Sequence, residues 1–242
     1  MPLLSAAPGP SGPASAAPER PRGAVVESEV IGRSVQGRPI RAWHLGEPGR
    51  RGVPRVVLIS TMHGNEGATR QVLATLRDGP RITGVDLWVV PVHNPDGLAA
   101  GTRRNARGVD LNRNFPYEWV DLDGRYESGP GPASEPETRA MMAFLDRVDP
   151  DRVLSFHQPL FGVDTDTKRP AFAREVARRL RLPRTTLSCG GVCHGTMTRW
   201  FNHTHEGAAL TVEYGARPTR RTMLIDAPSQ VLQVFDARVR RR

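Results

Sequence analysis

The sequence predicts a single α/β domain with a mixed, mostly parallel central sheet and helices on both faces. Apolar, strand-like runs alternate with amphipathic, helix-like stretches from residue 25 to the end of the chain, which is typical of sheets with parallel strands. The 242 residues correspond to about 1.6 typical domains of ~150 residues. One domain with appendages therefore fits better than two full domains.

The first 22 residues differ in composition from the rest of the chain. They contain six prolines among alanine, glycine and serine, and such a segment buries too little apolar area to offset its chain entropy. We therefore expect a disordered leader over residues 1–22 and a folded domain over residues 23–242. A signal peptide needs a basic start and an apolar stretch of ~7–15 residues. The segment has neither feature, so secretion is not expected.

The strands are predicted from turns and apolar runs. Residues 25–35 and 40–45 flank a turn with glycine and proline, which indicates a hairpin. The continuous apolar run 55–60 is typical of a strand buried on both faces. The segment that leads up to Gly108 is expected to be a long loop. Further strands are predicted over residues 85–92, 152–156 and 208–214.

Helices are predicted between these strands. Three apolar residues of the stretch 68–76 fall on one helical stripe. Ser134, followed three residues later by Glu137, has the spacing of a capping box that opens a helix toward Leu145. Two more helices are predicted over residues 170–180 and 229–239.

The charge and hydropathy of the chain limit its partners. A net charge of +9 suits anionic partners, or it reflects a solvated arginine-rich surface. Nucleic-acid binding would interleave basic residues with aromatics, and aromatics make up only 6% of the chain without such a pattern, so no nucleic-acid partner is expected. No apolar run approaches the ~18 residues of a membrane span. The basic tail 238–242 is expected to fray in solvent.

The two cysteines, Cys189 and Cys193, are too few for a disulfide framework. Reduced thiols in a reducing, cytoplasmic compartment are therefore the expectation. A disulfide between the two is one alternative. The other is a structural zinc site that they would form with His203 and His205, which are the residue types of a Cys₂His₂ site.

Polar residues follow four of the predicted strands. The segment His-Gly-Asn-Glu at 63–66 follows the first buried strand, and Asn-Pro-Asp-Gly at 94–97 follows the next. His157 and Glu213 close the remaining two strands. Since ligands of open α/β sheets bind beyond the carboxyl ends of the strands, these four ends predict a functional site.

Three of these side chains have the chemistry of a metal site. Two histidines and one glutamate, here His63, His157 and Glu66, form one of the known catalytic zinc sets, which leave one position for water. Gly64 is expected to allow the sharp backbone turn that this requires. Glu66 is expected in the first turn of the following helix, where the helix dipole favours a carboxylate. The alternative is that Glu66 only stabilises the start of this helix and binds no metal.

These segments, in order, resemble the zinc carboxypeptidase family, and within it the murein peptide amidase branch. The resemblance also includes Gly-Thr-Arg-Arg-Asn at 101–105, Thr-Val-Glu-Tyr at 211–214 and, above all, Gly-Val-Asp-Leu-Asn-Arg-Asn-Phe-Pro at 108–116. The last block is very specific for this family, whereas the His-x-x-Glu pair alone would be weak evidence for it. The resemblance covers about residues 26–214 and implies the fold of that family.

The resemblance also implies roles for single residues. Glu213 would be the general base, although a buried salt bridge with an arginine is the alternative for it. Arg103 would support the developing oxyanion. Asn112 and Arg113 would hold the terminal carboxylate of the substrate, for which a guanidinium fork is suited. The ligands of one Zn²⁺ per chain would be His63, Glu66 and His157.

The activity implied is hydrolysis of an amide bond next to a free C-terminal carboxylate in a small peptide. For the murein peptide amidase branch, the substrate would be L-Ala-γ-D-Glu-meso-diaminopimelate, and the terminal diaminopimelate would be released. One alternative is an N-acyl amino acid deacylase of the succinylglutamate or aspartate type, and another is a metal-binding module without turnover. The complete block 108–116 favours a peptidase, and the intact Glu213 favours turnover.

The pocket residues follow less directly. Digestive carboxypeptidases carry a tyrosine shortly before the general base, but no tyrosine lies between Tyr126 and Tyr214 here, so the second proton donor is unnamed. His194, in a glycine-rich loop, is a candidate proton donor or substrate-binding residue. Asp164 and Asp166 are candidates to meet the ammonium group of diaminopimelate, or they are solvated turn residues. The sequence carries no signal for the oligomeric state.

Overall fold

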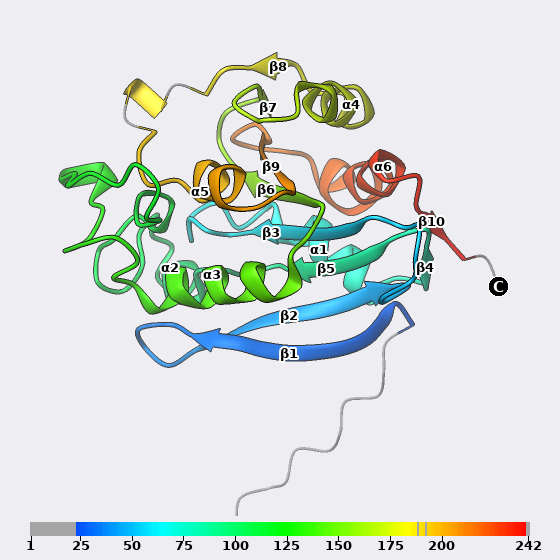
Figure 1. The fold of residues 1–242 in the computed structure, drawn as a ribbon, viewed down its shortest axis with the longest axis horizontal. Coiled ribbons are helices and arrows are strands. Elements are labelled where there is room, and N and C mark those ends of the chain that lie inside the picture. Colours follow the sequence, from blue (N-terminus) through cyan, green and yellow to red (C-terminus); the bar gives the residue numbers. More distant parts are fainter. Residues whose placement is uncertain (1–22, 188, 192, 241–242) are drawn as a thin grey trace, which may run out of the picture.

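A mixed sheet crosses the centre of the protein (Figure 1). The computed structural model describes residues 23–187, 189–191 and 193–240, so the predicted leader lies outside the described residues. In the described part of the chain the main sheet has eight strands in the order β1-β2-β5-β3-β6-β9-β7-β8. Their bounds are β1 Val25–Arg33, β2 Pro39–Gly46, β5 Asp86–Val90, β3 Arg55–Ser60, β6 Arg152–His157, β9 Ala208–Glu213, β7 Gly162–Asp164 and β8 Arg184–Thr185.

The four central strands β5, β3, β6 and β9 run parallel. The hairpin β1–β2 joins them antiparallel through β2 and β5, and β7 pairs antiparallel with β9. The predicted mixed, mostly parallel sheet is therefore confirmed. Because the central strands share one direction, their carboxyl ends lie at one edge of the sheet, and this edge positions the site.

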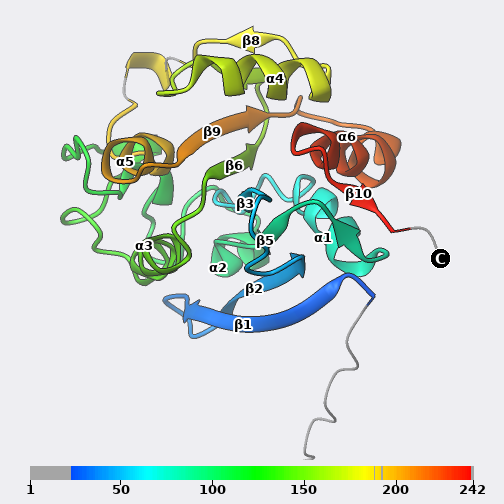
Figure 2. The ribbon, with the colours of Figure 1, turned by 45° about the vertical axis from the view of Figure 1, so that its right-hand side comes forward.

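Helices cover both faces of the sheet, as predicted (Figure 2). Val56 and Leu58 of β3 pack in the same core cluster as helices α1, α4 and α6. Val57 and Ile59, which point the other way, pack with α3 and α5. The continuous apolar run of β3 exists because both of its faces are buried. These covering helices are α1 Arg70–Asp78, α3 Pro136–Val148, α4 Pro170–Leu180, α5 Met197–Thr204 and α6 Ala227–Val234.

Two helices form where none was predicted. Helix α2, Pro95–Ala100, lies inside the predicted long loop; Asn94 caps it by accepting a hydrogen bond from the Gly97 N–H at 2.8 Å. Helix α5 begins after Thr196, whose side chain accepts from the Arg199 N–H. Helix α2 has six residues and no apolar stripe. Helix α5 does have one, Met197, Trp200 and Phe201 at i, i+3 and i+4, and sequence reasoning missed it.

The predicted capping box at the start of α3 is wrong. Glu135 is the cap residue of this helix, and no side chain caps it. The Ser134 hydroxyl instead donates to the Glu135 carboxylate at 2.9 Å. Glu137 accepts from the backbone N–H of Val35 at 3.0 Å. The Glu137 carboxylate is therefore occupied by a contact distant in sequence and does not complete the capping box.

The predicted terminal helix over residues 229–239 is wrong at both ends. A π-helical turn, Thr222–Asp226, leads directly into α6, and α6 ends at Val234. The next residues form strand β10, Arg238–Val239, which pairs antiparallel with β4, Ile82–Thr83. These tail residues therefore do not fray as expected, while the last two residues lie outside the described part.

Candidate active site

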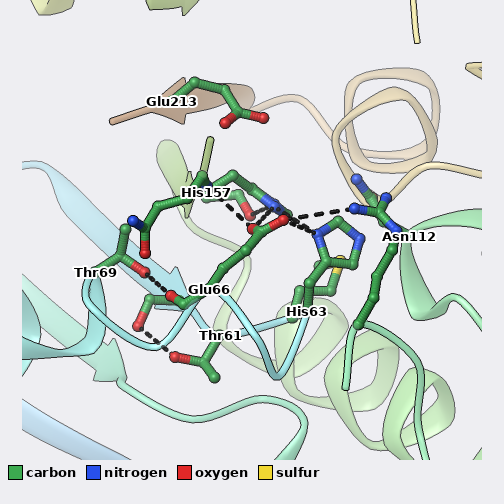
Figure 3. A network of polar contacts seen from close by, with 12 residues as sticks. Thr61, His63, Glu66, Thr69, Asn112, His157 and Glu213 are labelled. Atoms are coloured by element: carbon green, nitrogen blue, oxygen red, sulfur yellow. Dashed lines mark hydrogen bonds and ion pairs between the residues drawn. The ribbon is translucent and has the colours of Figure 1, made fainter. Parts of the chain in front are cut away.

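The strand ends bring three predicted metal ligands into contact (Figure 3). Nδ1 of His63 lies 2.8 Å from Oε1 of Glu66, and Nδ1 of His157 lies 3.0 Å from Oε2. The two Nδ1 atoms are 3.2 Å apart. All three side chains are buried, and their ligand atoms lie within 4.8 Å of one another.

A metal ion fits this donor set. The outer nitrogen of His63, Nε2, lies 3.0 Å from Oδ1 of Asp110, and Nε2 of His157 lies 2.9 Å from Oγ of Ser155. A proton on each Nε2 leaves both Nδ1 lone pairs directed at the same point as the carboxylate of Glu66. Outer contacts of this kind orient histidine ligands in metal sites, and two histidines with one glutamate form a catalytic zinc set.

The electrostatics of the cluster also favour a cation. Burial alone would lower the pKa of His63, but the carboxylates of Asp110 and Glu66 raise that pKa to about 9. Burial alone would raise the pKa of Glu66, but His63 and His157 hold that pKa well below its usual range. The surroundings therefore stabilise positive charge where the nitrogens meet.

The backbone around the ligands differs from the expectation in two respects. Glu66 lies before α1, which begins at Arg70, so it is not in the first helical turn. Its carboxylate is instead fixed by the backbone N–H of Gln158, which donates to Oε2 at 3.1 Å. Gly64 is not at a positive φ angle. A Cβ at Gly64 would lie 1.9 Å from the carbonyl carbon of Gly97, so close backbone approach, not a turn, requires this glycine.

Glu213 lies beside the cluster at the end of β9, directly opposite His157 in the strand register. Oε2 of Glu213 accepts a hydrogen bond from the Leu160 N–H at 3.1 Å. No arginine or lysine of the described residues forms an ion pair with it, so the salt-bridge alternative is wrong. Burial raises the pKa of Glu213, and the nearby charge of Glu66 raises it further.

A cavity of about 580 Å³ opens over the cluster and contains the predicted arginines. Arg103 donates through Nε to Oδ2 of Asp110 at 2.9 Å, and its Nη1 lies 3.5 Å from Oε1 of Glu66. Arg113 is buried, and its Nε has no hydrogen-bond partner among the described residues. The Asn112 side chain also lines the cavity, held by the Met197 N–H that donates to Oδ1 at 3.1 Å.

Of the three remaining predicted pocket residues, two line the cavity and one does not. Asp164 lines the cavity and is only 8% exposed, so it is not a solvated turn residue. Asp166 also lines the cavity but is mostly exposed. His194 is not among the cavity-lining residues; its Nδ1 lies 3.2 Å from the carbonyl of Glu118. The structure therefore does not bring His194 to the site.

Sequence reasoning missed Tyr126 as a site residue. It ends a 3₁₀ helix, Gly124–Tyr126, and lines the cavity. The guanidinium carbons of Arg113 and Arg103 lie 4.7 and 5.7 Å from its ring centre, within the range of cation–π contacts. The only sequence signal for Tyr126 was its position shortly after the block at 108–116, which contains Arg113.

The expectation of reduced cysteines is wrong. Cys189 and Cys193 form a disulfide, so their sulfurs cannot serve as thiolate ligands. His203 stacks on the ring of Tyr117, and the alternative of a structural zinc site with His203 and His205 is not formed. The cytoplasmic location depended on reduced thiols, because disulfides are rare in reducing compartments, and it loses that support.

Three converging ligands with a separate buried carboxylate beside them define the class of mononuclear metal-dependent hydrolases. Comparison with known families makes this more specific, because the model for zinc carboxypeptidases matches residues 19–159. The chain belongs to the zinc carboxypeptidase family, whose members are hydrolytic enzymes.

Individual relatives agree with this assignment. Murein peptide amidase A of Escherichia coli K12 is 34% identical over 191 residues, which cover 72% of this chain and 75% of the relative. The crystal structure of murein-tripeptide amidase from Escherichia coli O157 superposes with a TM-score of 0.72 at 26% identity, covering 90% and 96% of the two chains. Carboxypeptidase A from Helicoverpa armigera shares the fold, with a TM-score of 0.68 at 19% identity, covering 88% of this chain and 65% of the other. None of the helices in the described residues could cross a membrane.

Proposed function

We propose that this protein is a zinc-dependent hydrolase of murein peptides. It cleaves the amide bond next to a free C-terminal carboxylate and releases meso-diaminopimelate from L-Ala-γ-D-Glu-meso-diaminopimelate. The observation that carries the proposal is one cavity lined by His63, His157, Glu213, Asn112 and Arg113. The similarity to murein peptide amidase A over three quarters of that relative supports the choice of substrate.

His63, Glu66 and His157 would hold one zinc ion per chain. When bound, zinc polarises a carbonyl oxygen and lowers the pKa of a water molecule toward neutrality. Asp110 and Ser155 keep the two imidazoles in the orientation that binding requires.

Glu213 is the proton carrier in this proposal. Burial raises the pKa of Glu213 toward neutral pH, and a general base is most effective when its pKa lies near the working pH. The Leu160 N–H holds Oε2 of Glu213. The carboxylate takes a proton from the attacking water and then passes it to the leaving amine.

Three further side chains act on the substrate. Asn112 and Arg113 bind its terminal carboxylate; the buried Nε of Arg113 is a donor without a protein partner, and leaving such a donor unpaired is costly. Arg103, 3.5 Å from Glu66, stabilises the negative charge that develops on the carbonyl oxygen. Together these contacts select peptides with a free carboxylate at the cleaved residue.

The test incubates zinc-loaded protein with three substrates: the murein tripeptide, an α-linked tripeptide and an N-acyl amino acid. We expect cleavage of the first, with diaminopimelate as product. Cleavage of the N-acyl amino acid alone would instead indicate a deacylase. Glu213→Gln should lower kcat by about 10²- to 10⁴-fold with unchanged zinc content, and a loss of less than tenfold would contradict the assigned base. Arg113→Lys should lose its preference for free-acid over amidated peptides.

A further inference from the structure

The cavity has a second wall beyond the metal ligands, built from β7, β8 and α5. Asp164, at the end of β7, is buried there, and its Oδ1 accepts backbone hydrogen bonds from Asp166 at 3.1 Å and Leu187 at 3.2 Å. No arginine or lysine of the described residues forms an ion pair with Asp164. A buried carboxylate without a counter-charge is costly unless a ligand supplies one.

Burial raises the pKa of the Asp164 carboxyl group, and the charge of Asp166 raises it further. The described side chains therefore leave the negative charge of Asp164 without an ion-pair partner at the cavity wall.

A guanidinium group lines the same cavity as this carboxylate. Arg199 of α5 lines the cavity, and its Nε lies 3.6 Å from Oδ2 of Asp166. Its Nη2 lies 2.6 Å from Oε2 of Glu118, and its Nη1 donates to the carbonyl of Cys193 at 2.9 Å. Since Asp166 contacts both Asp164 and Arg199, an acidic and a basic group are neighbours on one wall.

Backbone groups of Leu187 and Cys193 hold both side chains in place. The Leu187 N–H binds Asp164 just before Cys189, and the carbonyl of Cys193 binds Arg199. The same helix α5 contributes the Met197 N–H that fixes Asn112. The charged wall and the proposed carboxylate-binding residue are therefore joined by one short stretch of chain.

We propose that Asp164 and Arg199 form a subsite for a zwitterionic amino-acid group, in which Asp164 binds the ammonium and Arg199 the carboxylate. This rests on the proposed function, because the side chain of diaminopimelate ends in such a group. Lysine would satisfy only Asp164, and an apolar side chain would satisfy neither residue. The subsite would thus select diaminopimelate over other terminal residues.

The test uses tripeptides L-Ala-γ-D-Glu-X with four terminal residues: meso-diaminopimelate, lysine, 2-aminopimelate, which lacks the distal amine, and norleucine, which lacks both charges. Asp164→Asn should lower kcat/KM about 10- to 100-fold for the two substrates with a distal amine and leave the other two within threefold. Arg199→Gln should do the same for the two substrates with a distal carboxylate. Arg199→Lys, which keeps the charge, should restore part of the loss.

Asp121→Asn, an exposed carboxylate outside the cavity-lining residues, is the matched control and should change nothing. Calorimetry with zinc-loaded protein and free meso-diaminopimelate gives a readout independent of turnover, and Asp164→Asn should weaken this binding about 10- to 100-fold. Equal losses on all four substrates, or no loss on any, would overturn the subsite. If wild type cleaves none of the tripeptides, the proposed function fails, and calorimetry alone decides whether the subsite exists.

Discussion

Replacing Asp110 with asparagine tests whether the contacts behind the metal ligands set metal affinity. Asp110 is fully buried and accepts from Nε2 of His63 through Oδ1 and from Arg103 through Oδ2. Asparagine keeps one acceptor for the imidazole. It removes the negative charge that raises the pKa of His63 and places an NH₂ group or a single uncharged oxygen against Arg103.

The expected loss can be bounded from these contacts. Removing an outer partner of a ligating histidine costs about 10- to 100-fold in metal affinity, which corresponds to about 1.4 to 2.7 kcal/mol. Arg103 also loses its closest anionic partner, so kcat should fall even when zinc is saturating. A competition titration with a chromophoric chelator measures zinc affinity, and saturated kinetics measure the second effect.

Asp86→Asn is the matched control, because the Asp86 carboxylate also contacts a histidine, His44, and an arginine, Arg55. It lies at the start of β5, at the opposite end of the strands from the metal ligands. This variant should lose stability, about 1–3 kcal/mol for the unpaired groups, but bind zinc as wild type does. If both variants bind zinc with wild-type affinity, Asp110 does not tune the site.

Three other predictions concern backbone packing, pH and the disulfide. Gly64→Ala should destabilise the protein by about 1–3 kcal/mol or more, because its Cβ would overlap a backbone carbon. Chemical denaturation checks this, and Gly131→Ala, where a Cβ meets no atom within 4 Å, is the control. Burial would lower the pKa of His44, but its carboxylate partners raise it above 6.5, so its stabilisation is complete below about pH 6.5 and is lost as pH rises through the raised pKa. The Tm difference between wild type and His44→Gln should shrink over that range, and a constant difference would contradict the shift. Replacing both Cys189 and Cys193 by serine should raise KM for the diaminopimelate peptide roughly 2- to 10-fold, from the cost of reordering side chains, without changing KM for the norleucine peptide.

Strands and their ends were predictable because their signal is local. The apolar run 55–60 and the polar ends at His63, His157 and Glu213 each lie within a few consecutive residues. The parallel order of the strands then places these ends along one edge. For this reason the sequence alone brought the three metal ligands together.

The groups behind and around the ligands were not predictable in the same way. Ser155 is an exception, because side chains two residues apart in a strand share a face, so its contact with His157 is local and was missed. Tyr126 reaches the cavity through loop packing, and Glu137 contacts Val35 across 102 positions of sequence. Such contacts depend on tertiary structure, which competes with local motifs and overrides them, as at the predicted capping box.

The buried carboxylates of the cavity divide by environment in a way that matches their proposed roles. Glu66 and Asp110 touch histidines or Arg103, and these partners hold their pKa values well below the usual range. Glu213 and Asp164 form no ion pair with an arginine or lysine of the described residues, and burial raises their pKa values. In the compensated pair, Glu66 is directed at the metal position and Asp110 at His63 and Arg103. The other pair is suited to receive positive charge from outside the protein. A proton would meet that need at Glu213, and the ammonium group of a substrate would meet it at Asp164.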